Sequence, residues 1–115
     1  VMSFYRIQSA ARDTADLLVA EHQTSMHYST GESQVGVSVC DSREELAEYI
    51  AQSGVEWDGS WVLVEVDGYT AEARDLDADA PGRPRLIHPT EVVSVEPLAD
   101  GFEDEIFAAY DAMYA

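Results

Sequence analysis

Residues 35–66 constrain the fold of this chain more than any other segment. Valines alternate with other residues at 35–39 and again at 62–66, and this two-residue period is typical of β-strands. The stretch between them, residues 42–53, has the three-to-four-residue spacing of apolar side chains that is typical of a helix. The segment is therefore predicted to form a strand-helix-strand unit around which the rest of the chain is arranged.

The predicted helix has a defined start and a defined apolar side. Ser42 is followed three residues later by Glu45, the spacing of a capping box, in which both side chains accept hydrogen bonds from backbone N–H groups of the first turn. Leu46, Tyr49 and Ile50 fall at i, i+3 and i+4, so we expect them to share one face of the helix. Leu46 and Ile50 are predicted to be core residues.

The flanking elements are predicted from shorter patterns. Residues 4–7 and 91–96 are rich in aromatic or β-branched side chains and are expected to be strands, and 85–88 is expected to form a further short strand that ends before Pro89. An amphipathic helix is expected over 10–21. A last helix is expected to begin at about residue 100, with an aromatic-rich inner face made of Phe102, Ile106, Phe107, Tyr110, Met113 and Tyr114.

These elements predict an α/β or α+β fold: a single small domain over residues 2–115, with a mixed sheet of four or five strands and about three helices. Met2 follows Val1 and is expected to be the native first residue. The lone cysteine, Cys40, excludes an internal disulfide. No export leader and no run of eighteen apolar residues is found, so a cytoplasmic location is expected.

The charge of the chain is far from average. Its 115 residues include 23 acids and 6 bases, which gives a net charge of −17 at neutral pH. Binding to nucleic acid or to anionic lipid is disfavoured, because both depend on Lys and Arg side chains that contact phosphates. A negative field of this size favours encounter with a positively charged surface. The partner expected from charge is therefore a basic protein.

The sequence predicts no metal site and no cofactor. Asp75, Asp77 and Asp79 have the spacing that opens an EF-hand loop, but Ala80 stands where the loop needs glycine and Leu86 where it needs glutamate. A solvated acidic loop is favoured, with weak divalent-cation binding as the alternative. The histidines and the cysteine show no zinc-ligand spacing, and no phosphate-binding glycine loop is present.

One set of residues resembles a known arrangement. Small ADP-ribosyltransferase-like domains often carry an early-strand Arg or His, then a polar Ser/Thr-rich segment, then a late Glu. Here Arg6 precedes His27, Ser29 and Thr30, and Glu91 begins the predicted strand 91–96. The tight Ser-Thr-Ser triplet and the E-x-E pair of that family are absent. The resemblance implies an enzyme that acts on a nucleotide or NAD-like ligand, with these five residues at its site.

Trp57 and Trp61 lie on either side of a predicted Asp58–Gly59–Ser60 turn. Tryptophan beside a turn can anchor a protein partner, or it can cover the core. Acidity is the only global property far from average, and catalytic motifs are absent. The leading hypothesis is therefore a noncatalytic acidic interaction module that binds a basic protein, with Trp57 and Trp61 as candidate anchors. The small enzyme described above is the alternative.

Overall fold

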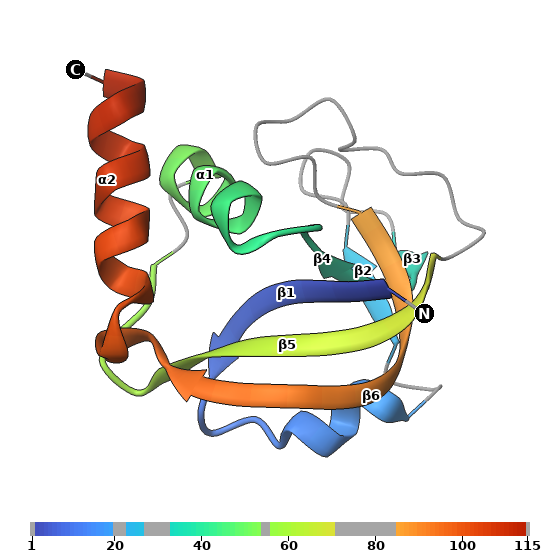
Figure 1. The fold of residues 1–115 in the computed structure, drawn as a ribbon. Coiled ribbons are helices and arrows are strands. Elements are labelled where there is room, and N and C mark those ends of the chain that lie inside the picture. The colour runs from blue at the N-terminus through green and yellow to red at the C-terminus, as the bar shows by residue number, and fades with distance from the viewer. Residues whose placement is uncertain (1, 20–22, 27–32, 54–55, 71–84, 115) are drawn as a thin grey trace.

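A four-stranded antiparallel sheet forms the centre of the computed structural model, which describes residues 2–19, 23–26, 33–53, 56–70 and 85–114 (Figure 1). Its strands, in spatial order, are β1 (Met2–Ser9), β5 (Trp61–Thr70), β6 (Arg85–Pro97) and β4 (Val37–Val39). A separate antiparallel pair is formed by β2 (Thr24–Met26) and β3 (Ser33–Val35). The helices are α1 (Arg43–Ser53), α2 (Phe102–Tyr114) and the short 3-10 helices η1 (Thr14–Leu18) and η3 (Leu98–Asp100).

The sheet curls until its two edge strands meet. Tyr5 of β1 and Cys40, just after β4, form a bridge in which each backbone N–H donates to the other residue's carbonyl oxygen at 2.9 Å. The order of pairing therefore runs from β1 through β5, β6 and β4 back to β1. Such closure protects backbone groups that an open edge would leave unpaired.

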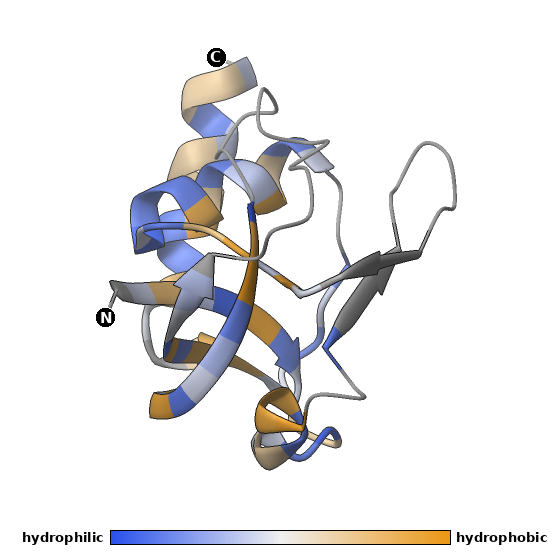
Figure 2. Ribbon diagram, turned by 90° about the vertical axis from the view of Figure 1, so that its right-hand side faces the viewer, coloured by the Kyte–Doolittle hydropathy of each residue, from blue (hydrophilic) through white to orange (hydrophobic). Residues whose placement is uncertain are grey.

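The inner face of the curled sheet carries the first hydrophobic cluster. Phe4 lies opposite Val66 in the β1–β5 pair, and both side chains are fully buried. Because side chains alternate along a strand, every second residue of β1 and β5 points to this face. Hydrophobic segments, orange in Figure 2, occur on the strands, as expected of a sheet that carries apolar side chains on both faces. The cluster consists of Phe4, Leu17, Val37, Val39, Val64, Val66 and Ile87.

The outer face is covered by α1 and α2, which lie side by side on the opposite side of the sheet from η1 (Figure 1). Tyr5 and Ile7 of β1 pack against this second cluster, as do residues of both helices. Its fully buried members are Cys40, Leu46, Ala47, Ile50, Leu63, Leu98, Phe102 and Ile106. The sheet therefore lies between the two hydrophobic clusters.

The predicted fold class and helix α1 are confirmed. The structure is α+β, and α1 covers the predicted range with the Oγ of Ser42 accepting from the N–H of Glu45 at 3.1 Å. Leu46 and Ile50 are buried as expected. The described sheet is antiparallel throughout rather than mixed, because β6 pairs with both β4 and β5 and so separates the two valine-rich strands that α1 connects.

The predicted helix over 10–21 is corrected to a single short turn. Within the described part of that segment only η1 is helical; the Asp13 carboxylate accepts from the N–H of Ala15 at 2.9 Å, and extended backbone at Val19 ends the turn. The described residues therefore contain two α-helices rather than about three. Leu17 is buried beneath the sheet while Leu18 is 42% exposed, so the two leucines do not share a buried face.

Strand β6 continues through Pro89, where the sequence predicted a break between two strands. Pro89 lies opposite Gly68, at a point where the register of the β5–β6 pair shifts. A Cβ at Gly68 would lie 2.5 Å from the carbonyl oxygen of His88, so only glycine permits this close approach. The register shift accommodates Pro89, which has no N–H to donate to the neighbouring strand, and regular pairing continues on both sides of it.

Strand pairing also breaks once at a glycine within the predicted strand 35–39. Gly36 adopts a φ of 122°, a conformation that L side chains rarely adopt, and it separates β3 from β4. Its N–H donates to the carbonyl oxygen of Gln23 at 2.6 Å. One predicted strand therefore contributes to two different sheets.

Candidate functional site

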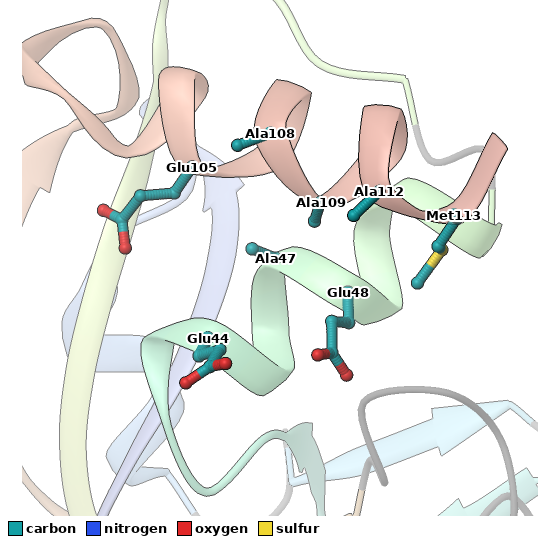
Figure 3. A pocket seen from close by; sticks show the side chains of 8 residues that line it. All are labelled: Glu44, Ala47, Glu48, Glu105, Ala108, Ala109, Ala112 and Met113. Carbon is teal, nitrogen blue, oxygen red and sulfur yellow. The ribbon is translucent and has the colours of Figure 1, made fainter. Parts of the chain in front are cut away.

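Helix α2 exposes aromatic side chains that the sequence predicted to be buried. Phe102 and Ile106 are in the core, but Phe107, Tyr110 and Tyr114 are 53%, 51% and 62% exposed. The three exposed rings lie on the side of α2 that faces away from α1, because Ala108, Ala109 and Ala112 occupy the side that faces Ala47 of α1 (Figure 3). Phe107, Tyr110 and Tyr114 are called the aromatic stripe below.

The aromatic stripe forms one continuous surface. Its members fall at i, i+3 and i+7 and therefore lie on one side of α2. The rings of Tyr110 and Tyr114 are 4.6 Å apart between centroids. Large exposed apolar side chains that gather in this way are a common mark of protein-protein contact surfaces, in which Tyr and Phe are enriched.

Trp57 extends the aromatic stripe towards the core. Its ring centroid is 6.1 Å from that of Phe107 at an interplanar angle of 43°, and its other contacts are with the second hydrophobic cluster. Trp61 also packs against that cluster and is half-buried, and its backbone N–H donates to the carbonyl oxygen of Asp58 at 3.1 Å. Both tryptophans thus cover the core, and Trp57 in addition adjoins the exposed surface. Their role as partner anchors stays a prediction.

Carboxylates flank the aromatic stripe. Asp104 precedes Phe107 by three residues and Asp111 follows it by four, so both are neighbours of Phe107 on the helix surface, and both are exposed. Glu103 lies one turn below Phe107 on the same side. No base lies on α2. This side of the helix therefore combines large apolar rings with uncompensated negative charge.

A groove of about 540 Å³ lies between α1 and α2, away from the aromatic stripe (Figure 3). Glu44 and Glu48 of α1 and Glu105 of α2 stand around it, and alanines lie where the helices face each other. Arg43 bonds Glu105 at 2.6 Å and Glu96 at 2.9 Å, and the hydrogen bond to Glu105 is the main cause that raises the pKa of Arg43. The small alanine side chains leave this space between the helices, and Glu44 and Glu48 add to the negative field.

The structure separates Arg6 and Glu91, the two enzyme candidates that lie within the described residues. Arg6 lies opposite Val64 and shares the inner face with Phe4, whereas Glu91 lies opposite Asp67 in the neighbouring alternation and is exposed on the outer face. Arg6 and Glu91 are thus on opposite faces of the sheet. His27, Ser29 and Thr30 lie outside the described residues, and their part in such a site stays a prediction.

The described histidine and cysteine have structural surroundings. Gln23 donates through Nε2 to the carbonyl oxygens of Leu17 and Pro89, so its Oε1 accepts the Nδ1–H of His88 at 2.9 Å. Burial, followed by the charges of Glu45 and Asp41, raises the pKa of Cys40 to about 12, which keeps the thiol protonated and unreactive. Within the ranges described, no three His, Cys, Asp or Glu side chains gather as a metal site; the acidic segment 75–79 lies outside them.

The sequence contained a signal for the aromatic stripe that the prediction did not use. The six apolar residues assigned to the inner face of α2 cover more of the helix circumference than one contact with a sheet can bury. When the apolar residues span a wider arc of the helix than the core can bury, some of them must face water or a partner. In α2 the apolar residues from Phe107 onwards are the ones that lie outside the core.

Among the residues described, no helix is long and apolar enough to cross a membrane. Searches of protein-family models, curated proteins and solved structures found no match to this chain.

Proposed function

We propose that this protein is a noncatalytic interaction module that binds a basic partner protein through the aromatic stripe of α2. The observation that carries the proposal is the set of three large rings, Phe107, Tyr110 and Tyr114, that are more than half exposed and flanked by acids. Binding energy in protein interfaces is concentrated in a few such aromatic anchors. The surrounding carboxylates supply complementarity to positive charge.

The chemistry of the surface also indicates what the partner should contain. Apolar side chains of the partner would cover the aromatic stripe, and its Lys or Arg side chains would pair with Asp104 and Asp111 or lie over the tyrosine rings. A second copy of this chain is a poor occupant, because two bodies of charge −17 repel each other. A cytoplasmic setting, expected from the sequence, is compatible with such a partner.

The test is capture of a basic partner from the native host, followed by binding kinetics at about 50 mM and about 300 mM salt. We expect the association rate to fall steeply with salt, because the long-range field steers encounter. Tyr110→Ala and Phe107→Ala should each speed dissociation about tenfold, the effect of losing one anchor. Trp57→Ala should act in the same direction, but it also removes packing from the core, so it is the less direct test.

Tyr69→Ala is the matched control, because Tyr69 is an aromatic residue on β5 that is 63% exposed and lies on a different element from the aromatic stripe. Its dissociation rate should equal that of the unmodified protein. An association rate that does not change with salt, or equal effects of Tyr69→Ala and Tyr110→Ala, would contradict the proposal.

A further inference from the structure

The groove between α1 and α2 has an apolar floor and acidic residues around it. Its lining residues form one row on each helix, and they recur every three or four positions in both rows, so the two rows face one another along the groove. The space that they enclose is about 540 Å³. Most of the lining residues carry small or flexible apolar side chains: Ala47 of α1, and Ala108, Ala109, Ala112 and Met113 of α2.

Two of the three glutamates at the groove lack a cationic partner. Glu105 is paired with Arg43 at 2.6 Å, so its charge is already compensated. No ion pair or hydrogen bond joins the carboxylate of Glu44 or Glu48 to another residue in the described part of the chain. Figure 3 shows Glu44 at the same end of the groove as Glu105, and Glu48 towards the other end, near Met113. Uncompensated negative charge is therefore present along the α1 side of the groove.

The two uncompensated carboxylates have a spacing that a helix can match. Glu44 and Glu48 are four residues apart on α1, so about 6 Å separates their positions along the helix axis. Lys or Arg side chains that are four residues apart on an incoming helix have the same spacing. The alanines of the floor allow the backbone of such a helix to approach closely, and the flexible side chain of Met113 can adapt to it.

We propose that this groove is the docking site for a basic amphipathic helix of the partner protein. The helix places its apolar side on the alanines and its Lys or Arg side chains against Glu44 and Glu48, the mode in which amphipathic helices bind in hydrophobic grooves. A second copy of this chain offers no such helix, because α2 carries no base and the one base of α1, Arg43, is already paired. The inference rests on the proposed function for one point, that the partner is a basic protein.

The probe is a synthetic helical peptide of about sixteen residues made of Ala, Leu and Lys, with lysines four residues apart beside an apolar side. It is titrated into the isotope-labelled protein at about 50 mM salt, and the alanine methyl resonances are followed by NMR. Those of Ala108, Ala109 and Ala112 should shift, because these methyl groups line the groove. A peptide in which glutamine replaces every lysine should bind about tenfold more weakly.

Two double variants separate local charge from net charge. Glu44→Gln combined with Glu48→Gln removes two charges at the groove and should weaken peptide binding about fivefold, the effect of losing two exposed ion pairs. Asp104→Asn combined with Asp111→Asn removes two exposed charges elsewhere on α2 and should change the affinity by less than about twofold. Ala112→Gln puts a longer uncharged side chain into the groove and should weaken binding about tenfold.

The outcomes distinguish the groove from the aromatic stripe. The peptide should bind Tyr110→Ala as tightly as the unmodified protein, because the aromatic stripe lies on the other side of α2. Equal losses for the two double variants would show that net charge alone attracts the peptide and would overturn the proposal. A peptide that does not bind, or that leaves the alanine methyl resonances of the groove unmoved, would also overturn it. A captured partner that binds independently of Phe107 and Tyr110 would count against the aromatic stripe and not against the groove.

Discussion

At the scale of single residues, burial rather than chemical type decides which side chains matter for stability. Leu46 and Leu18 are both leucines on helical turns, but Leu46 lies in the second hydrophobic cluster whereas Leu18 is 42% exposed. Burying an apolar side chain is the main favourable term in folding, and its removal also leaves a cavity. The two leucines should therefore differ strongly when each is shortened.

Leu46→Ala is expected to lower the free energy of unfolding by about 2 to 5 kcal/mol, the range for truncation of a buried leucine. Leu18→Ala should cost less than about 1 kcal/mol, since most of its surface already contacts water. Chemical denaturation of both variants measures the difference. Equal costs would mean that α1 does not bury its apolar stripe as described.

Gly68 gives a second prediction at this scale. A Cβ at Gly68 would lie 2.5 Å from a backbone oxygen of β6, so Gly68→Ala should destabilise the protein by about 1 to 3 kcal/mol through forced separation of β5 and β6. Gly59→Ala is the control, because a Cβ there meets nothing within 4 Å. Thermal unfolding of the pair tests the close approach, and a Gly68→Ala variant as stable as Gly59→Ala would contradict it.

At the scale of elements, helix α1 was predictable and helix α2 only in part. The start of α1 and its buried side follow from nearby residues, Ser42, Leu46 and Ile50, which interact within one or two turns. How far α2 extends past the sheet depends on where the sheet ends, which no local pattern contains. The same holds for the position of β6 between β4 and β5, which sets the sheet order.

The cap of α1 is testable by itself. Ser42→Ala removes the acceptor for the N–H of Glu45 and should lower the free energy of unfolding by about 1 kcal/mol. Ser53→Ala, at the last residue of the same helix, is the matched control and should cost less, because the Ser53 hydroxyl only adds a 3.4 Å bond to a carbonyl oxygen that lies within the helix. Urea denaturation of both variants gives the comparison. A larger loss for Ser53→Ala would contradict the assigned cap.

At the scale of the whole molecule, the net charge of −17 acts against the compact state. The described ion pairs involve only Arg43 and Arg85, so most carboxylates have no cation to offset their mutual repulsion in the described ranges. The acidity could be read from the composition. The acids with which Arg43 and Arg85 pair could not be read from it, because these contacts join residues that are far apart in the sequence.

Raising sodium chloride to about 0.5 M should therefore increase the melting temperature, since added ions screen repulsion between surface charges. The measurement is a thermal scan at low and at high salt. A melting temperature that falls with salt would indicate that attractive pairs outweigh repulsion.

The bridge that joins Tyr5 to Cys40 has a kinetic consequence. Strand β1 pairs with β5 over eight residues, whereas its other edge meets β4 through the two hydrogen bonds of this bridge. Local opening is expected first where the fewest hydrogen bonds join two strands. The curled sheet should therefore open between β1 and β4 while the remaining strands stay paired. The amide protons of Tyr5 and Cys40 should then exchange with deuterium sooner than those in the middle of the β5–β6 ladder.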